Sequence, residues 1–200
     1  MNKEIMVVPT QKVLKNYFLG AIHKDVRNYK EIIDNNYEWM RREDAETNTA
    51  YKQPIPYIVV MNEENKIFAF QRANKKKDYS EKRLFDKWSI GVGGHVDKDT
   101  DKENPIQKGM MRELQEEIHF DELKSTSLLG YINYDLDNVG KVHFGLLYLA
   151  RIKGVAKPKD SEVATSKMMK LNEVEALFAK ETVDAEDWSV YTLQLLKHQG

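Results

Sequence analysis

The segment from residue 88 to residue 120 constrains the fold more than any other, because it joins a glycine-rich strand to a sharply bounded helix. The predicted strand, 88–96, is largely apolar and contains three glycines. After it, Asn104 suits the N-cap of a helix and Pro105 suits its first position. Apolar residues then recur at every fourth position, which predicts a helix whose apolar stripe faces a core: Ile106, Met110, Leu114 and Ile118.

The remaining pattern predicts a mixed α/β or α+β fold, with strands first, one helix in the middle and further helices at the end. Residues 56–61 and 66–72 are expected to form a hairpin. Strands are also expected at 5–8, 141–152 and 167–171, and helices at 29–46, 172–179 and 185–198. We predict that residues 1–50 form an N-terminal extension that packs on the core or makes a dimer contact, and that residues 51–200 form the main domain.

The chain contains no cysteine, which excludes disulfide frameworks, cysteine-based zinc sites, iron–sulfur clusters and thiol nucleophiles. Any metal ion must therefore bind oxygen atoms or histidine nitrogens. A hydrophobic fraction of 41% over 200 residues allows a folded core, and a formal net charge of −1 gives no reason to expect a nucleic-acid or anionic-membrane partner. The longest apolar run, 144–150, is far shorter than a membrane span, so we expect a cytoplasmic protein.

Three glutamates gather near the end of the predicted helix. Glu113, Glu116 and Glu117 stand at i, i+3 and i+4, so their carboxylates share one face within one turn. Their mutual repulsion is relieved by solvent, by a cationic side chain or by a divalent metal ion. A solvated helix face is the commoner explanation for such a triplet. The glycines ahead of the helix favour the metal, because bare backbone can approach an ion or a phosphate closely and Mg²⁺ prefers oxygen ligands.

Two neighbours of the acidic face bear on this hypothesis. Arg112 lies four residues before Glu116, where it can pair with a carboxylate and fix its rotamer. Gly109, one turn before Glu113, costs about 1 kcal/mol of helix propensity relative to alanine. We interpret that glycine as room left for a ligand.

The acidic loop 97–103 superficially suggests a calcium-binding EF-hand. Lys102 occupies the position that requires glycine, and Lys108 occupies the position that requires glutamate. The sequence therefore disfavours an EF-hand at this loop.

Residues 93–96 and 112–120 together resemble the Nudix box of the Nudix hydrolases. The family pattern places a glycine upstream of Arg-Glu-U-x-Glu-Glu-x-Gly-U, where U is apolar. The run 112–117, Arg-Glu-Leu-Gln-Glu-Glu, satisfies the core of that pattern completely. The resemblance extends more loosely over residues 56–179 and implies the α/β/α sandwich of the family.

The resemblance implies hydrolysis of the diphosphate bond in a nucleoside diphosphate linked to another moiety, with Mg²⁺ or Mn²⁺ as cofactor. The implied metal ligands are a backbone carbonyl and carboxylates: Gly93, Glu113, Glu116 and Glu117. Arg112 would orient them. The general base in this family comes from the box or from a later loop, so Glu113, Glu116 and Glu162 are all candidates.

The sequence departs from the family pattern in three places. The loop 97–104 carries about four residues more than the pattern allows. The family pattern also has a glutamate eight residues before its arginine. Asn104 stands at that position here, and Glu103 is the nearest substitute. His119 stands where the family has a glycine at the helix end, so we expect His119 to adopt a left-handed conformation.

A nucleotide-like diphosphate is the implied substrate, and a homodimer is compatible with the extension at residues 1–50. Arg72, at a strand end, and Glu162 are candidates for binding that substrate, whereas Lys75, Lys76 and Lys77 fit a solvated loop better. The alternative function is a non-catalytic, nucleotide-binding sensor domain of the same fold. A diphosphate isomerase is disfavoured, because the best-known form of that activity on this fold uses a catalytic cysteine.

Overall fold

The computed structural model of the chain describes residues 3–73, 86–98, 103–159 and 163–197. It divides into two compact units. Unit 1 contains residues 1–57, 93–113 and 128–148, and unit 2 contains residues 58–92, 114–127 and 149–200. No helix among the described residues is long and apolar enough to span a membrane.

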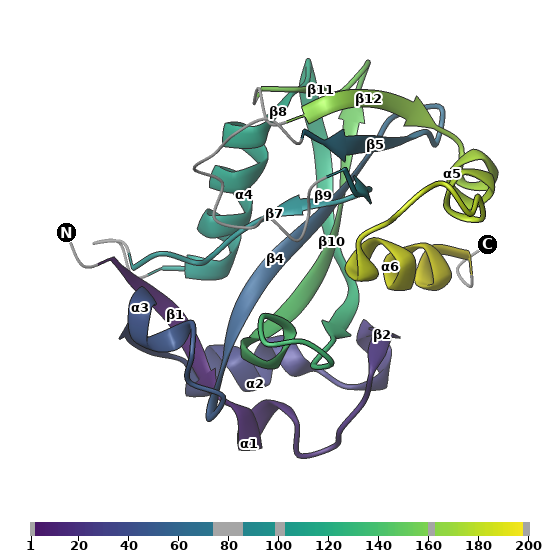
Figure 1. Cartoon of the computed structure of the whole chain (residues 1–200). Helices are drawn as coiled ribbons and strands as arrows, with labels where there is room; N and C mark the ends of the chain where they lie inside the picture. The colour runs from purple at the N-terminus through teal and green to yellow at the C-terminus, as the bar shows by residue number, and fades with distance from the viewer. Residues whose placement is uncertain (1–2, 74–85, 99–102, 160–162, 198–200) are drawn as a thin grey trace. The chain divides into compact units, whose positions relative to one another are not determined.

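The N-terminal part of unit 1 holds short elements of mixed type. They are β1 (Glu4–Pro9), α1 (Thr10–Val13), β2 (Gly20–His23), the 3₁₀ turn η1 (Lys24–Val26), α2 (Tyr29–Asn36), β3 (Glu38–Arg41) and α3 (Arg42–Ala45). The strand predicted at 5–8 is confirmed, and β1 lies beside α3 (Figure 1).

The single helix predicted at 29–46 is interrupted at residues 37–41, between α2 and α3. The helix begins after Asn28, whose side chain accepts a hydrogen bond from the backbone of Glu31, and it ends at Asn36. The chain then becomes β3, which pairs antiparallel with β1, with Met40 opposite Ile5. Ile5 is fully buried, and Met40 packs against the apolar cluster that contains it. Strand pairing and this burial therefore override the helical spacing of Met40.

Three long strands contribute residues to both units. They are β4 (Tyr51–Met61), β9 (Glu122–Asn133) and β10 (His143–Lys153), the last preceded by the 3₁₀ turn η3 (Gly140–Val142). β4 and β10 confirm the strands predicted at 56–61 and 141–152, whereas β9 and β2 were not predicted. β2 pairs antiparallel with β9, from Gly20 opposite Asn133 to His23 opposite Gly130.

The central helix, α4 (Pro105–Glu117), begins at the predicted residue and ends one residue before Ile118, the last residue of the predicted stripe. Its predicted apolar stripe is buried, with exposed fractions of 0–2% for Ile106, Met110, Leu114 and Ile118. His119 does not have the predicted left-handed conformation. It belongs to β8 (Ile118–His119), which pairs with β11 (Lys157–Pro158), and the chain passes from helix to strand without a left-handed residue.

The remaining elements of unit 2 are β5 (Ile67–Arg72), β6 (Trp88–Ser89), β12 (Val163–Met169), α5 (Leu171–Phe178) and α6 (Asp187–Lys197). The predicted hairpin is confirmed, because Met61 of β4 pairs antiparallel with Ile67 of β5. β12 pairs along the whole of β5 (Figure 1), and α5 and α6 confirm the two helices expected at the end of the chain.

The strand predicted at 88–96 is interrupted. It divides into β6 and β7 (Val92–Gly93), because the Ser89 hydroxyl accepts a hydrogen bond from the N–H of Gly91 and also lies 2.9 Å from the carbonyl oxygen of Gly91. The hydrogen-bonded order of the main sheet is β12-β5-β4-β10-β9-β2, with β6 on β5 and β7 on β4. The chain therefore has the mixed α+β composition that the sequence predicts.

Candidate active site

Helix α4 presents the three glutamates at graded depth. Glu113 is 8% exposed, Glu117 is half-buried and Glu116 is exposed. Because residues at i, i+3 and i+4 of a helix lie on one face, the carboxylates run from the protein interior toward solvent. Glu113 is thus held by the protein, while Glu116 is exposed to solvent.

Arg112 holds the buried end of this face. Its Nη2 atom lies 2.7 Å from Glu113 Oε1 and 3.1 Å from Asp97 Oδ2, and it donates to the carbonyl of His95 at 2.8 Å. Asp97 also pairs with Lys3, whose Nζ atom lies 2.7 Å from Asp97 Oδ2. The guanidinium therefore connects the start of the loop before the helix to the carboxylate of Glu113.

The glycines before the helix lie where a side chain cannot fit. A Cβ at Gly94 would lie 2.6 Å from Glu113 Oε1, and a Cβ at Gly93 would lie 1.9 Å from the carbonyl oxygen of Pro56. Bare backbone at residue 94 thus lets the segment lie directly against the Glu113 carboxylate.

The interpretation of Gly109 as room for a ligand is wrong. Gly109 is buried, and a Cβ there would lie 3.3 Å from Val96 Cγ2 and 3.5 Å from Val96 Cα. The small residue lets α4 approach the chain at Val96, which is 1% exposed. Close packing of the helix therefore accounts for this glycine.

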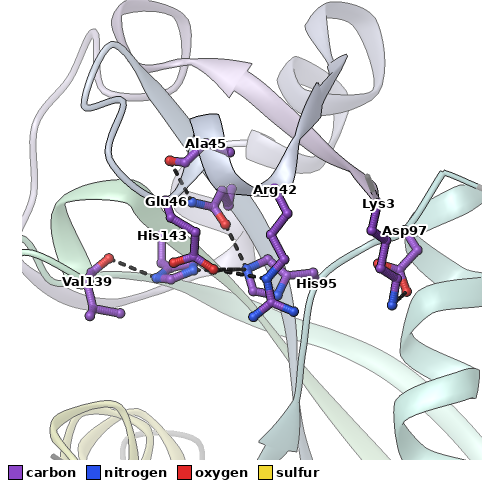
Figure 2. A network of polar contacts seen from close by, with 9 residues as sticks. Lys3, Arg42, Ala45, Glu46, His95, Asp97, Val139 and His143 are labelled. Atoms are coloured by element: carbon purple, nitrogen blue, oxygen red, sulfur yellow. Dashed lines mark hydrogen bonds and ion pairs between the residues drawn. The ribbon is translucent and has the colours of Figure 1, made fainter. Parts of the chain in front are cut away.

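A buried polar network surrounds the ring of His95 (Figure 2). His95 Nε2 lies 2.7 Å from Gln53 Oε1 and 3.3 Å from His143 Nε2. Burial, together with His143 and nearby cationic side chains, lowers the pKa of His95 to about 3, so the ring is neutral at neutral pH. Glu46 Oε1 lies 4.0 Å from His95 Nε2, and because the ring is neutral this contact is not an ion pair.

In unit 2, the predicted substrate-binding residue Arg72 is held by Glu186. Arg72 Nε lies 2.7 Å from Glu186 Oε1, and the guanidinium carbon lies 5.3 Å from the ring centroid of Phe70. The other carboxylate oxygen of Glu186 accepts a hydrogen bond from the Ser89 hydroxyl at 2.9 Å. These contacts fix the direction of the guanidinium. Glu162, like Lys75, Lys76 and Lys77, lies outside the described residues.

Sequence reasoning missed several residues of this region. Asp97 was considered only as a calcium ligand, and Gln53, Glu186 and Lys3 carried no motif. His143 was left outside the site as a lone strand histidine, although it contacts His95. All of these contacts join residues far apart in the chain, so periodicity gives no signal for them.

The donor set fits a hard divalent cation. Carboxylate and carbonyl oxygens are the ligands that Mg²⁺ prefers, and it usually keeps several waters and takes only one or two carboxylates from the protein. Among the described residues, no group of three or more histidine, aspartate or glutamate side chains is arranged to hold a metal ion. A binding mode with few carboxylates and several waters does not require such a group. Because Gly94 has no Cβ, the backbone lies next to the Glu113 carboxylate. A metal ion bound by both a backbone carbonyl and a carboxylate would need this proximity.

Comparison with known proteins identifies the family. The model of the NUDIX domain matches residues 51–193. Protein YmaB of Bacillus subtilis (strain 168) is 32% identical over 209 residues, which cover 98% of this chain and 98% of YmaB. The chain therefore belongs to the NUDIX family, and this membership supports a hydrolase activity.

Solved structures agree with this assignment. The crystal structure of Tm1382, a protein assigned to the Nudix hydrolases, has a TM-score of 0.81 at 27% identity and covers 98% of this chain and 100% of its own. The NUDIX domain of Shewanella oneidensis NrtR, solved with ADP ribose, has a TM-score of 0.54 at 13% identity, with 74% of this chain and 88% of that chain covered. The second likeness concerns the fold alone. The predicted Nudix fold class is confirmed.

Proposed function

We propose that this protein hydrolyses the diphosphate bond of a nucleoside diphosphate linked to another moiety, by attack of water at phosphorus, with Mg²⁺ or Mn²⁺ as cofactor. The observation that carries the proposal is the run 112–117 on α4, in which a buried, Arg112-paired Glu113 precedes a more exposed Glu116 and Glu117. Because the chain belongs to the NUDIX family, this arrangement of carboxylates supports hydrolysis of a diphosphate bond.

The metal would be held by carboxylates of α4 and by the backbone carbonyl of Gly93. Glu113, Glu116 and Glu117 would bind it either directly or through metal-bound waters. A bound divalent cation neutralises phosphate charge and lowers the pKa of an attacking water. Arg112 keeps the Glu113 carboxylate in one orientation through the 2.7 Å contact. Either Glu113 or Glu116 would serve as the general base, and Glu162 remains the distal candidate.

Arg72 is proposed to bind a substrate phosphate. Its side chain is 18% exposed, and the Glu186 carboxylate and the Phe70 ring hold its guanidinium. A guanidinium held in this way keeps a fixed orientation, and its planar fork suits bidentate recognition of phosphate.

The first experiment is a release assay for phosphate or nucleoside monophosphate. The panel contains nucleoside triphosphates, dinucleotides, nucleotide sugars and ADP ribose, which the NrtR domain binds, each tested with and without Mg²⁺. Mg²⁺-dependent release from at least one compound supports the proposal. Failure on every compound, together with tight nucleotide binding by calorimetry, would favour the sensor function instead.

The second experiment tests the site itself with Glu116→Gln. This exposed substitution is expected to keep the fold and to lower Mg²⁺-dependent turnover by about 10²–10⁴-fold, the loss typical of removing acid–base help. Glu122→Gln is the matched control, because Glu122 is an exposed glutamate of β9 that pairs with Lys124. Near-normal turnover of Glu116→Gln would contradict the site assignment.

We also propose that residues 51–200 carry the chemistry, while residues 1–50 support it or make a dimer contact. Within unit 1, the N–H of Met6 donates to the carbonyl of Val96, and Lys3 pairs with Asp97. Both contacts reach the segment that leads to α4. Sedimentation of the full chain over a range of concentrations tests the dimer, and a monomer at every concentration would exclude it.

A further inference from the structure

In unit 1, the hydrogen bonds of the His95 and His143 rings determine which ring nitrogen carries the proton in each histidine. Gln53 Nε2 donates to the carbonyl of Ala45 at 3.0 Å, which leaves Gln53 Oε1 as an acceptor. Because His95 Nε2 lies 2.7 Å from that oxygen, His95 carries its proton on Nε2. The Nδ1 atom of His143 lies 2.8 Å from the carbonyl of Val139, so His143 carries its proton on Nδ1. Its bare Nε2 atom then faces the N–H of His95 at 3.3 Å.

Gln53 and His143 are buried, His95 is half-buried, and the three residues come from different parts of unit 1. Gln53 is 1% exposed, His143 is 7% exposed and the side chain of His95 is 14% exposed. Gln53 belongs to β4 and His143 begins β10. Figure 2 shows the imidazoles of His95 and His143 approaching each other, with Val139 on the far side of His143. The ring of His95 is thereby anchored to β4 and to the start of β10.

The backbone of His95 leads directly to the acidic face of α4. Its carbonyl accepts a hydrogen bond from Arg112, and the same guanidinium contacts Glu113. Gly94, the preceding residue, lies against the Glu113 carboxylate with no room for a Cβ. Any movement of the His95 backbone therefore moves both groups that hold Glu113.

We propose that His95 is a positioning residue, which uses Gln53 and His143 to hold the segment 93–95 and thereby the Arg112–Glu113 pair. The inference rests on the proposed function, because it assigns the carboxylate of Glu113 to metal binding. His95 touches neither substrate nor metal in this scheme. Its role is to keep the ligating oxygen of Glu113 in one place.

The central test compares two substitutions of His95. His95→Phe keeps an aromatic ring but removes the N–H, and it is expected to weaken Mn²⁺ binding, measured by calorimetry, by about 10–100-fold. His95→Gln places an amide N–H near the position of Nε2, and it is expected to restore most of that affinity. Gln53→Leu removes the acceptor and is expected to behave like His95→Phe. His23→Phe, which changes a histidine in β2, is the matched control.

The kinetic result separates positioning from general destabilisation. With a substrate from the release assay, His95→Phe is expected to lower kcat by about 10²-fold with KM unchanged, as for a small misplacement of a catalytic group. Urea unfolding identifies any variant that has lost its fold, and such a variant is replaced by Gln53→Leu or His143→Phe. Folded His95→Phe and Gln53→Leu proteins with wild-type Mn²⁺ affinity and wild-type kcat would overturn the inference.

NMR of the histidine ring nitrogens in the metal-free protein tests the proton positions of His95 and His143 independently of activity. Long-range proton–nitrogen spectra are expected to show His95 protonated at Nε2 and His143 protonated at Nδ1, and the Arg112 side-chain signal should shift in Gln53→Leu. The opposite tautomers, or an unmoved Arg112 signal, would refute the positioning role. A wild-type protein that binds no Mn²⁺ and turns over no substrate would refute the proposed function instead, and the spectra alone would then decide the inference.

Discussion

Gly94→Ala is expected to lower kcat while preserving the fold. A Cβ at residue 94 would lie 2.6 Å from Glu113 Oε1, whereas ordinary van der Waals contact begins at 3.4 Å, so the carboxylate must retreat by about 0.8 Å. That movement disturbs its 2.7 Å contact with Arg112. Since a misplacement of about 1 Å can cost about 10²-fold in rate, we expect kcat to fall by about that factor. The clash involves the end of a flexible side chain, so the free energy of unfolding should change by only about 1 kcal/mol.

Neighbouring glycines provide the matched comparison. Gly93→Ala would place its Cβ 1.9 Å from the carbonyl oxygen of Pro56, and the backbone must shift to admit it. We expect that variant to lose about 3 kcal/mol or more of unfolding free energy. Gly109→Ala meets Val96 Cγ2 at 3.3 Å but gains about 1 kcal/mol of helix propensity, so its stability should stay near that of the wild type. Urea unfolding and initial rates on all three variants give the answer. Wild-type kcat in Gly94→Ala, or unfolding of that variant as severe as in Gly93→Ala, would refute the reasoning.

Two further predictions concern buried charges. Burial lowers the pKa of Lys52 from its usual 10.5 to about 8, against an opposing effect of Asp135. Between these pH values the unfolded chain binds more protons than the folded chain, so wild-type stability should rise with pH by roughly 3 kcal/mol relative to Lys52→Met. Urea unfolding of both proteins across pH 8 to 10.5 measures the difference, and parallel curves would contradict it. Glu186→Gln is expected to cost about 1–3 kcal/mol of unfolding free energy, because it removes the charge that pairs with the half-buried Arg72. If Arg72 binds substrate, Arg72→Lys should raise KM with kcat little changed, whereas an unchanged KM would restrict Arg72 to a structural role.

Local patterns predicted the central helix well. Asn104, Pro105 and the apolar stripe of α4 determine where that helix lies and which face it buries, and the structure reproduces both. The same local reasoning failed for residues 38–41, because their partner in β1 lies far away in the chain. It also failed at His119, since pairing with β11 makes a left-handed helix end unnecessary.

The candidate site likewise contains some features that local sequence patterns predict and others that they do not. The shared face of the α4 carboxylates follows from their spacing along one helix, so the sequence predicts it. The sequence also predicts that Arg112 pairs with a carboxylate, from its spacing to Glu116. The 2.7 Å contact of Arg112 with the adjacent Glu113 does not follow from that spacing. The contacts of Asp97 with Arg112 and of His95 with Gln53 depend on tertiary packing, so no local sequence pattern predicts them. Gly109 was misinterpreted for the same reason, because its buried neighbour Val96 is known only from the fold. A single sequence therefore shows the spacing of the candidate metal-binding carboxylates, but not the tertiary contacts that hold those carboxylates in place.

The most direct test of the proposed hydrolysis uses water labelled with heavy oxygen. The wild-type protein is incubated with Mg²⁺ and a substrate from the release panel, and the products are analysed by mass spectrometry. Water attack at phosphorus predicts one heavy oxygen atom on a phosphate product, formed only with Mg²⁺ and strongly reduced in Glu116→Gln. Heavy oxygen on a non-phosphate product, or equal labelling without the metal ion, would contradict the account.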